Sequence, residues 1–139
     1  KVITNYLASL HLLGIGEALT VSKKHNLDLG LTYNAIKISS GNSFVNETET
    51  KVILSGSYDV GFTMDLAKKD INLFNNLADE FKIPVDFAKL LNKKFKKGIK
   101  LFGSRSFSTK IVKMLEDECG IKMRAKNFPK KLIDNEKKK

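Results

Sequence analysis

Two polar residues at the start of the chain, Lys1 and Asn5, have the spacing of neighbours on one face of a helix. They stand in the otherwise mostly apolar stretch KVITNYLASLHLLGIGEALTVSKKH, and side chains four positions apart lie one above the other on a helix. An amine beside a carboxamide can move a proton and bind a substrate oxygen. The alternative is that Lys1 is only an exposed terminal residue.

The helix that carries this pair is expected to run from Lys1 to about His25. A helix that is apolar nearly all round is typically buried, so the rest of the chain should pack around this one. Its two glycines, Gly14 and Gly16, are expected to let another helix approach closely, at a propensity cost of about 1 kcal/mol each. Its apolar residues are Val2, Ile3, Tyr6, Leu7, Leu10 and Leu13 on one side, and Ala8, Leu12, Ile15, Ala18 and Leu19 on most of the rest.

A second anomaly lies in the predicted fourth helix, where Asp70 falls inside an apolar stripe and Lys69 at its edge. A buried carboxylate is costly unless it is paired and hydrogen-bonded. Asp70 is therefore either a structural carboxylate that holds a loop or a lysine, or part of a site. On a helical wheel the stripe consists of Phe62, Leu66, Phe74, Leu77 and Phe81, and the opposite face of Lys68, Asn72, Asn75 and Asp79.

Five further helices are indicated by capping residues and by glycine and proline signals. Asp28 and Ser43 should cap the second and third helices, Ser106 or Ser108 the sixth, and Gly120 should end the last one. No alternating β pattern is present, so we expect an all-α domain over residues 1–120, with 121–139 as an extended basic tail. The expected ranges are about 28–39, 43–54, 62–82, 87–101 and 106–118.

The net charge of +10 raises nucleic acid as a partner. The lysines of the predicted fifth helix, however, share one side of it, as is typical of a solvated face, and no aromatic residues alternate with them as stacking platforms. We therefore expect no nucleic-acid partner, and a basic helical adaptor for nucleic acid or an acidic protein is the alternative function. The apolar side consists of Phe87, Leu90, Leu91, Phe95 and Ile99, and the basic side of Lys89, Lys93, Lys96, Lys97 and Lys100.

The single cysteine, Cys119, excludes an internal disulfide framework and fits a cytoplasmic protein. The apolar run from Tyr6 to Ile15 is too short to span a bilayer and no signal peptide is recognisable, so no membrane partner is expected. His11 and His25 lack the spacing of a metal pair, and we expect no metal site.

Several short motifs, in this order and spacing, resemble the C-terminal domain of the β-hydroxyacid dehydrogenases. This family includes 3-hydroxyisobutyrate dehydrogenase and is related to 6-phosphogluconate dehydrogenase. The resemblance covers roughly Lys1 to Lys100. Its motifs are Lys1-x-x-x-Asn5, the stretch from Glu17-Ala18 to Leu27-Asp28, the Ser39-Ser40-Gly41 bend, and Gly61-Phe62 followed by Leu66-x-x-Lys69-Asp70.

This resemblance implies an all-α domain of the 6-phosphogluconate dehydrogenase-like type, with about six helices around a long first helix. It implies further that an N-terminal Rossmann domain binds NAD or NADP. Since the chain opens on Lys1 without an initiator methionine, we expect that domain to precede it and the isolated helical domain to be inactive. The apolar surface left by the Rossmann domain suggests a homodimer.

The resemblance also implies site roles. Lys1 would be the catalytic general acid/base in the oxidation of a small 3-hydroxyacid or the reduction of a semialdehyde. Asn5 and Phe62 would bind substrate, and Lys69 and Asp70 would serve the cofactor, Asp70 by orienting Lys69 or its surroundings. Ser40 and Gly41 would complete the substrate pocket, although a polar bend of this kind is more often only a helix cap.

One departure narrows the chemistry. Thr4 and Ala8 stand where 6-phosphogluconate dehydrogenases carry a histidine and a glutamate. The acid needed to protonate an enediol after decarboxylation is therefore absent, and we do not expect that reaction.

Overall fold

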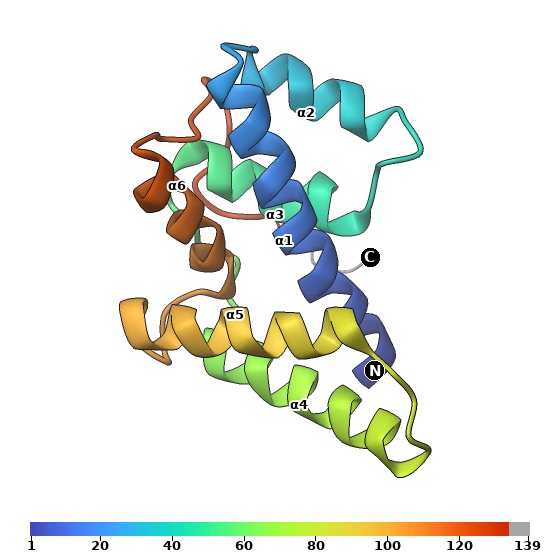
Figure 1. Ribbon diagram of the computed structural model, residues 1–139. Helices are drawn as coiled ribbons and strands as arrows, with labels where there is room; N and C mark the ends of the chain where they lie inside the picture. The colour runs from blue at the N-terminus through green and yellow to red at the C-terminus, as the bar shows by residue number, and fades with distance from the viewer. Residues whose placement is uncertain (134–139) are drawn as a thin grey trace.

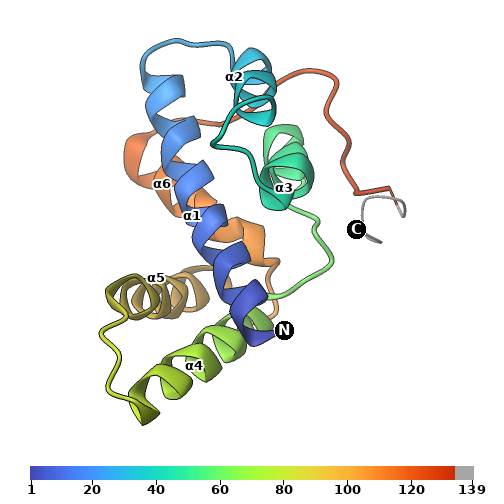
Figure 2. The same ribbon diagram turned by 90° about the vertical axis from the view of Figure 1, so that its right-hand side faces the viewer.

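Helix α1 (Val2–Lys24) is the central rod of the domain and contacts every other helix. In the computed structural model, which describes residues 1–133, the N-terminal end of α1 lies beside the pair formed by α4 and α5, and the rest of α1 runs past α2, α3 and α6 (Figures 1 and 2). The described residues contain no strand, only the isolated bridge Thr63↔Phe107. The predicted all-α class and its organisation around the first helix are confirmed. The other elements are α2 (Leu29–Lys37), α3 (Phe44–Ser55), α4 (Met64–Glu80), α5 (Asp86–Phe102), the 3-10 helix η1 (Ser108–Val112) and α6 (Lys113–Cys119).

Only one side of α1 is buried, so the prediction of burial all round is wrong. Ile3, Leu7 and Val21 are 62%, 41% and 59% exposed, because the other helices cover only the opposite side of α1. That buried side consists of Ser9, Leu12, Ile15, Gly16, Leu19 and Thr20.

The two glycines of α1 differ in how closely another segment approaches them. A Cβ on Gly16 would lie 2.9 Å from Val112 Cγ2, whereas a Cβ on Gly14 would meet nothing within 4 Å. Close approach is therefore confirmed at Gly16 and wrong at Gly14.

By length and composition α1 is apolar enough to cross a membrane, with a mean hydropathy of 1.2 over its most apolar window. The prediction concerned only the run from Tyr6 to Ile15, which is part of this 23-residue helix. The core helix of a soluble protein passes the same test, so this property alone does not identify a membrane span.

The predicted caps of α2 and α3 are confirmed. The side chain of Asp28 accepts a hydrogen bond of 2.8 Å from the amide of Leu31, and Ser43 Oγ accepts one of 3.0 Å from the amide of Asn46. Gly120 ends α6 with a φ of 62°, a left-handed conformation that glycine adopts without strain. The cap predicted for the sixth helix is wrong, because Phe107 precedes η1 and makes no side-chain cap.

Helix α4 begins at Met64 rather than at Phe62, and it buries a different face from the predicted one. Leu66, Leu77 and Phe81 are 37%, 48% and 77% exposed. Asn75, predicted to point away, is buried and donates to the carbonyls of Ile71 and Ala88. The buried face of α4 consists of Met64, Ala67, Asp70, Ile71, Asn75 and Ala78.

The segment after Gly120 contains no helix, as expected, but it packs against the domain. Met123 is fully buried, and the Arg124 guanidinium lies 2.6 Å from the buried carboxylate of Glu116. The amide of Ala125 donates to the carbonyl of Leu54 at 3.1 Å. Residues 121–133 therefore share the core of the helices, and the last part of the predicted tail, 134–139, lies outside the described residues.

Candidate functional site

The two polar anomalies of the sequence meet in the structure. Asn5 Nδ2 donates a hydrogen bond of 2.6 Å to Asp70 Oδ2. Because carboxylate oxygens accept, the nitrogen of Asn5 must face Asp70, which leaves Asn5 Oδ1 and the second N–H for other partners. Asp70 is only 7% exposed, so this bond provides the partner that a buried carboxylate requires.

An aromatic stack fixes the two helices at this point. The rings of Tyr6 and Phe74 lie 3.9 Å apart at an interplanar angle of 8°. Tyr6 follows Asn5 on α1, and Phe74 lies one turn after Asp70 on α4. The stack therefore holds the backbones from which both polar side chains extend.

Lys1 lies one turn before Asn5, at the exposed start of α1. Its carbonyl accepts the amide of Asn5 at 3.0 Å and the hydroxyl of Thr4 at 2.9 Å. The start of the chain lies beside α4 in both views (Figures 1 and 2). The structure thus places the Lys1 turn on the same side of the domain as Asp70.

Lys69 is an exposed cation beside this pair. Its ammonium nitrogen is 3.9 Å from Asp70 Oδ1, and its side chain is 60% exposed. An ion pair this long and this exposed contributes little to stability. Lys69 therefore lies beside Asp70 without being buried with it, in a surface hollow of about 400 Å³ that Lys68 also lines.

A small pocket of about 160 Å³ adjoins Asn5 on the inner side. Phe62 lines it from the connection before α4, where the amide of Ser108 donates to the Phe62 carbonyl at 2.8 Å. Two of the predicted substrate residues, Asn5 and Phe62, are thus brought together. The other lining residues are Ala8, Ser9 and Leu12 of α1, Glu49 of α3, Ala67 of α4 and Ser108 of η1.

The prediction missed Glu49. Its Oε2 atom is buried and has no hydrogen-bond partner, and burial raises its pKa from 4.5 to about 7. A signal was present in the sequence, because Glu49 has helical spacing from Val45 and Val52, which are both buried. A carboxyl group on the apolar face of a predicted helix is the same pattern that identified Asp70.

Ser40 and Gly41 lie elsewhere. Both are exposed, and they line a separate hollow of about 590 Å³ with the middle of α1 and the start of α5. The structure does not bring them to Asn5 and Phe62. Their role in substrate binding stays a prediction that no contact supports.

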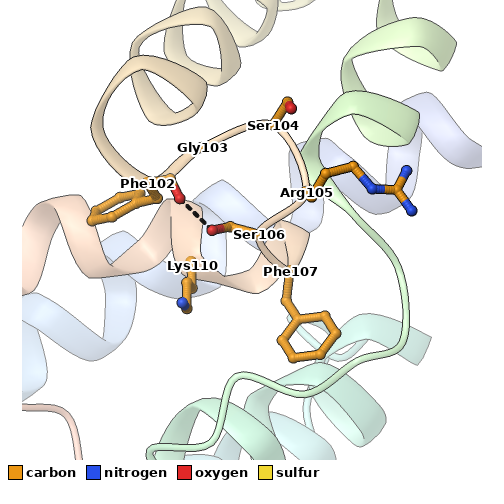
Figure 3. Close-up of a pocket in the computed structure, with 7 residues that line it drawn as sticks. All are labelled: Phe102, Gly103, Ser104, Arg105, Ser106, Phe107 and Lys110. Carbon is orange, nitrogen blue, oxygen red and sulfur yellow. Dashed lines mark hydrogen bonds between the residues drawn. The ribbon is translucent and has the colours of Figure 1, made fainter.

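The loop between α5 and η1 forms a further hollow of about 530 Å³ (Figure 3). Its two cationic side chains, Arg105 and Lys110, point away from each other in Figure 3, and Arg105 is paired with Asp65 at 3.1 Å. The hollow therefore does not offer one concentrated anion site. Within residues 1–133, no three side chains of the metal-binding types gather as a possible metal site.

Comparison with known proteins gives a consistent picture. Residues 1–115 match the family model described as NAD-binding of NADP-dependent 3-hydroxyisobutyrate dehydrogenase. The 2-(hydroxymethyl)glutarate dehydrogenase of Eubacterium barkeri is 28% identical over 122 residues, which are 87% of this chain and 40% of that protein. The L-threonate dehydrogenase of Haemophilus influenzae is 27% identical over 88 residues, 63% of this chain and 29% of that protein.

Solved structures show the same fold. A 3-hydroxyisobutyrate dehydrogenase from Salmonella typhimurium superposes with a TM-score of 0.76 at 21% identity, covering 82% of this chain and 40% of that one. The Mycobacterium tuberculosis 3-hydroxyisobutyrate dehydrogenase with L-serine gives a TM-score of 0.71 at 18% identity, covering 83% of this chain and 42% of that one. The chain therefore spans less than half the length of these relatives.

Proposed function

Because the chain belongs to the 3-hydroxyisobutyrate dehydrogenase family, we propose that it is the C-terminal domain of an NAD(P)-dependent dehydrogenase of small hydroxyacids. In this proposal the domain supplies the catalytic lysine, Lys1, and part of the substrate pocket. The observation that carries it is the hydrogen bond between Asn5 and Asp70. This bond sets the turn that carries Lys1 and Asn5 against α4, beside the cation of Lys69.

The residues of this site suit proton transfer during alcohol oxidation. A bound nicotinamide dinucleotide would supply the acceptor for the hydride. The amine of Lys1 takes the hydroxyl proton as the carbonyl forms, and returns it in the reverse direction. Asn5 offers its remaining N–H to a substrate oxygen and its Oδ1 to the Lys1 ammonium. Phe62 provides an apolar wall that keeps water from the reacting carbon.

The residues also fit a dinucleotide. Lys69 presents an exposed ammonium next to the site, which suits a phosphate or ribose oxygen of NAD or NADP. We propose that the main dinucleotide site lies on a Rossmann domain that precedes this chain. A cytoplasmic location is proposed with it, since the single cysteine suits a reducing compartment.

Exposed apolar side chains support a larger assembly. Leu73 and Leu77 on α4 and Phe81 directly after it are 43%, 48% and 77% exposed, and Ile3 on α1 is 62% exposed. Exposed apolar side chains of this size are typical of surfaces that other domains or subunits cover. We propose that the Rossmann domain and a second copy of the protein cover them.

The test uses the longer protein in which the proposed Rossmann domain precedes Lys1. Reduction of NAD and of NADP is followed with 3-hydroxyisobutyrate, L-threonate and 2-(hydroxymethyl)glutarate. Lys1→Met should lower kcat by about a thousandfold or more, because the proton acceptor is lost, while the Kd for dinucleotide stays nearly unchanged. Wild-type turnover in that variant would remove Lys1 from the mechanism, and the absence of any activity with the whole panel would contradict the proposed function.

The alternative of a basic adaptor rests only on the lysines of α5. Lys89, Lys96, Lys97 and Lys100 are exposed, and Lys97 is already paired with Glu118 at 2.6 Å. Binding to DNA or RNA that is tight at physiological salt and falls steeply as salt is raised would favour it.

A further inference from the structure

Glu49 has no role in the mechanism above, yet it is one of the residues that line the pocket beside Asn5. It extends from the middle of α3, on the face that also buries Val45 and Val52. Its Oε2 atom is buried and unpaired. Buried polar atoms in native proteins rarely lack a partner, so a group that enters the pocket is the natural partner for this one.

The protonation state of Glu49 limits what that group can be. Burial raises the pKa of its carboxyl to about 7, so near neutral pH a large share of the molecules carry it protonated. A protonated carboxyl both donates and accepts hydrogen bonds. An alcohol hydroxyl has the same dual capacity and is its natural complement.

The rest of the lining favours a hydroxyl over a second carboxylate. Ser9 and Ser108 contribute hydroxyl groups, and none of the described residues that line the pocket is basic. A second carboxylate of the substrate would find no counter-ion in this pocket. It would also lie next to Glu49, and the repulsion between two negative charges would force Glu49 to stay protonated. The remaining walls are apolar and would contact the carbon chain.

The size of the pocket agrees with a short substrate. About 160 Å³ is below the range of roughly 300–1,000 Å³ for sites of drug-sized ligands. The space suits a few carbon atoms with their hydroxyls.

We propose that Glu49 is a specificity-determining residue that hydrogen-bonds a hydroxyl on the substrate beyond the one that is oxidised. The preferred substrate is then a short polyhydroxy acid, rather than an alkyl-substituted or dicarboxylic hydroxyacid. This inference rests on the proposed function and adds the substrate class to it.

The experiment compares L-threonate, which carries additional hydroxyls, with 3-hydroxyisobutyrate, which carries only the reacting one. The protein with its preceding domain is assayed as wild type, Glu49→Leu and Glu49→Gln. The wild type should prefer L-threonate. The leucine variant lacks the hydrogen bond and should lower kcat/KM for L-threonate about 10- to 100-fold, with less than about a threefold change for 3-hydroxyisobutyrate. The glutamine variant keeps a donor and an acceptor and should retain most of the preference.

Glu47→Leu is the matched control, since Glu47 lies two residues away on α3 and its side chain bonds Asn42 outside the pocket. It should leave the ratio of the two kcat/KM values unchanged. Circular dichroism of each variant reports its folding. If Glu49→Leu does not fold, the proposal is still tested by the substrate preference of the wild type and by whether Glu49→Gln retains it.

The outcomes separate the two proposals. A wild type that oxidises 3-hydroxyisobutyrate but does not prefer L-threonate overturns the role of Glu49 and leaves the proposed function standing. A folded Glu49→Leu variant that loses both substrates equally also overturns the specificity role. A wild type that oxidises 2-(hydroxymethyl)glutarate but neither of these two compounds overturns only the role of Glu49, and one that oxidises none of the three with either dinucleotide overturns both proposals.

Discussion

The carboxamide of Asn5 donates a 2.6 Å hydrogen bond to the carboxylate of Asp70, which lies 65 residues further along the chain. The bond joins the first turn of α1 to the middle of α4. Together with the stacked rings of Tyr6 and Phe74, it fixes where the proposed catalytic Lys1 begins its helix. A residue far from Lys1 in the sequence thus positions the turn on which the proposed chemistry depends.

Breaking this bond should destabilise the domain. Asn5→Leu leaves the buried carboxylate of Asp70 with only the distant ammonium of Lys69, and we expect a loss of about 2–4 kcal/mol in the free energy of unfolding. Urea denaturation of the chain measures it. The double variant Asn5→Leu, Asp70→Leu should lose less than the sum of the two single variants, because neither partner remains unpaired. If the loss in the double variant equals the sum of the two single losses, the side chains of Asn5 and Asp70 are not energetically coupled.

Removing the charge of Lys69 should affect cofactor binding and not folding. Its side chain is 60% exposed and its ion pair is 3.9 Å long, so Lys69→Met should change stability by less than about 0.5 kcal/mol. The KM for dinucleotide should rise roughly tenfold, as expected for the loss of one charge-assisted contact. Lys96→Met, on the exposed face of α5, is the control and should leave that KM unchanged. An equal effect of both variants would indicate general electrostatics instead of a contact.

Glu49 should make stability depend on pH. Burial raises its pKa from 4.5 to about 7, so between these values the folded chain keeps a proton that the unfolded chain has released. The free energy of unfolding should therefore fall as pH rises through this window, by up to about 3 kcal/mol from this residue. The difference between wild type and Glu49→Gln, measured by urea denaturation at about pH 4.5 and about pH 8, isolates it. A difference that is the same at both pH values would contradict the shift.

Two glycines on one helix should respond in opposite directions. Gly16→Ala would place a Cβ 2.9 Å from Val112 Cγ2, and this overpacking should destabilise the fold by about 1–2 kcal/mol. Gly14→Ala meets nothing within 4 Å and should stabilise it by about 0.5–1 kcal/mol through helix propensity. Thermal unfolding of the two variants compares them directly. The same sign for both would show that Val112 moves aside at little cost.

The sequence by itself determined the local structure and marked most of the polar residues that matter. The caps at Asp28 and Ser43 and the helix end at Gly120 depend on atoms within a few residues, so they are readable from the chain. Asn5 and Asp70 stood out because each is a polar residue with apolar neighbours at helical spacing. Glu49 fits the same pattern and could have been found in the same way.

Only the tertiary structure decided which face of each helix is covered. Helix α4 carries apolar side chains on more than one face, and their periodicity alone does not say which face is covered. Packing of α4 against α1 and α5 instead buries Ala67, Ile71 and Ala78, and leaves Leu77 and Phe81 exposed. The bond between Asn5 and Asp70 likewise joins two sequence signals that have no local connection. Which helix face is buried and which polar side chains pair both depend on contacts between segments that are distant in the sequence. The angular position of a residue on its own helix does not specify those contacts.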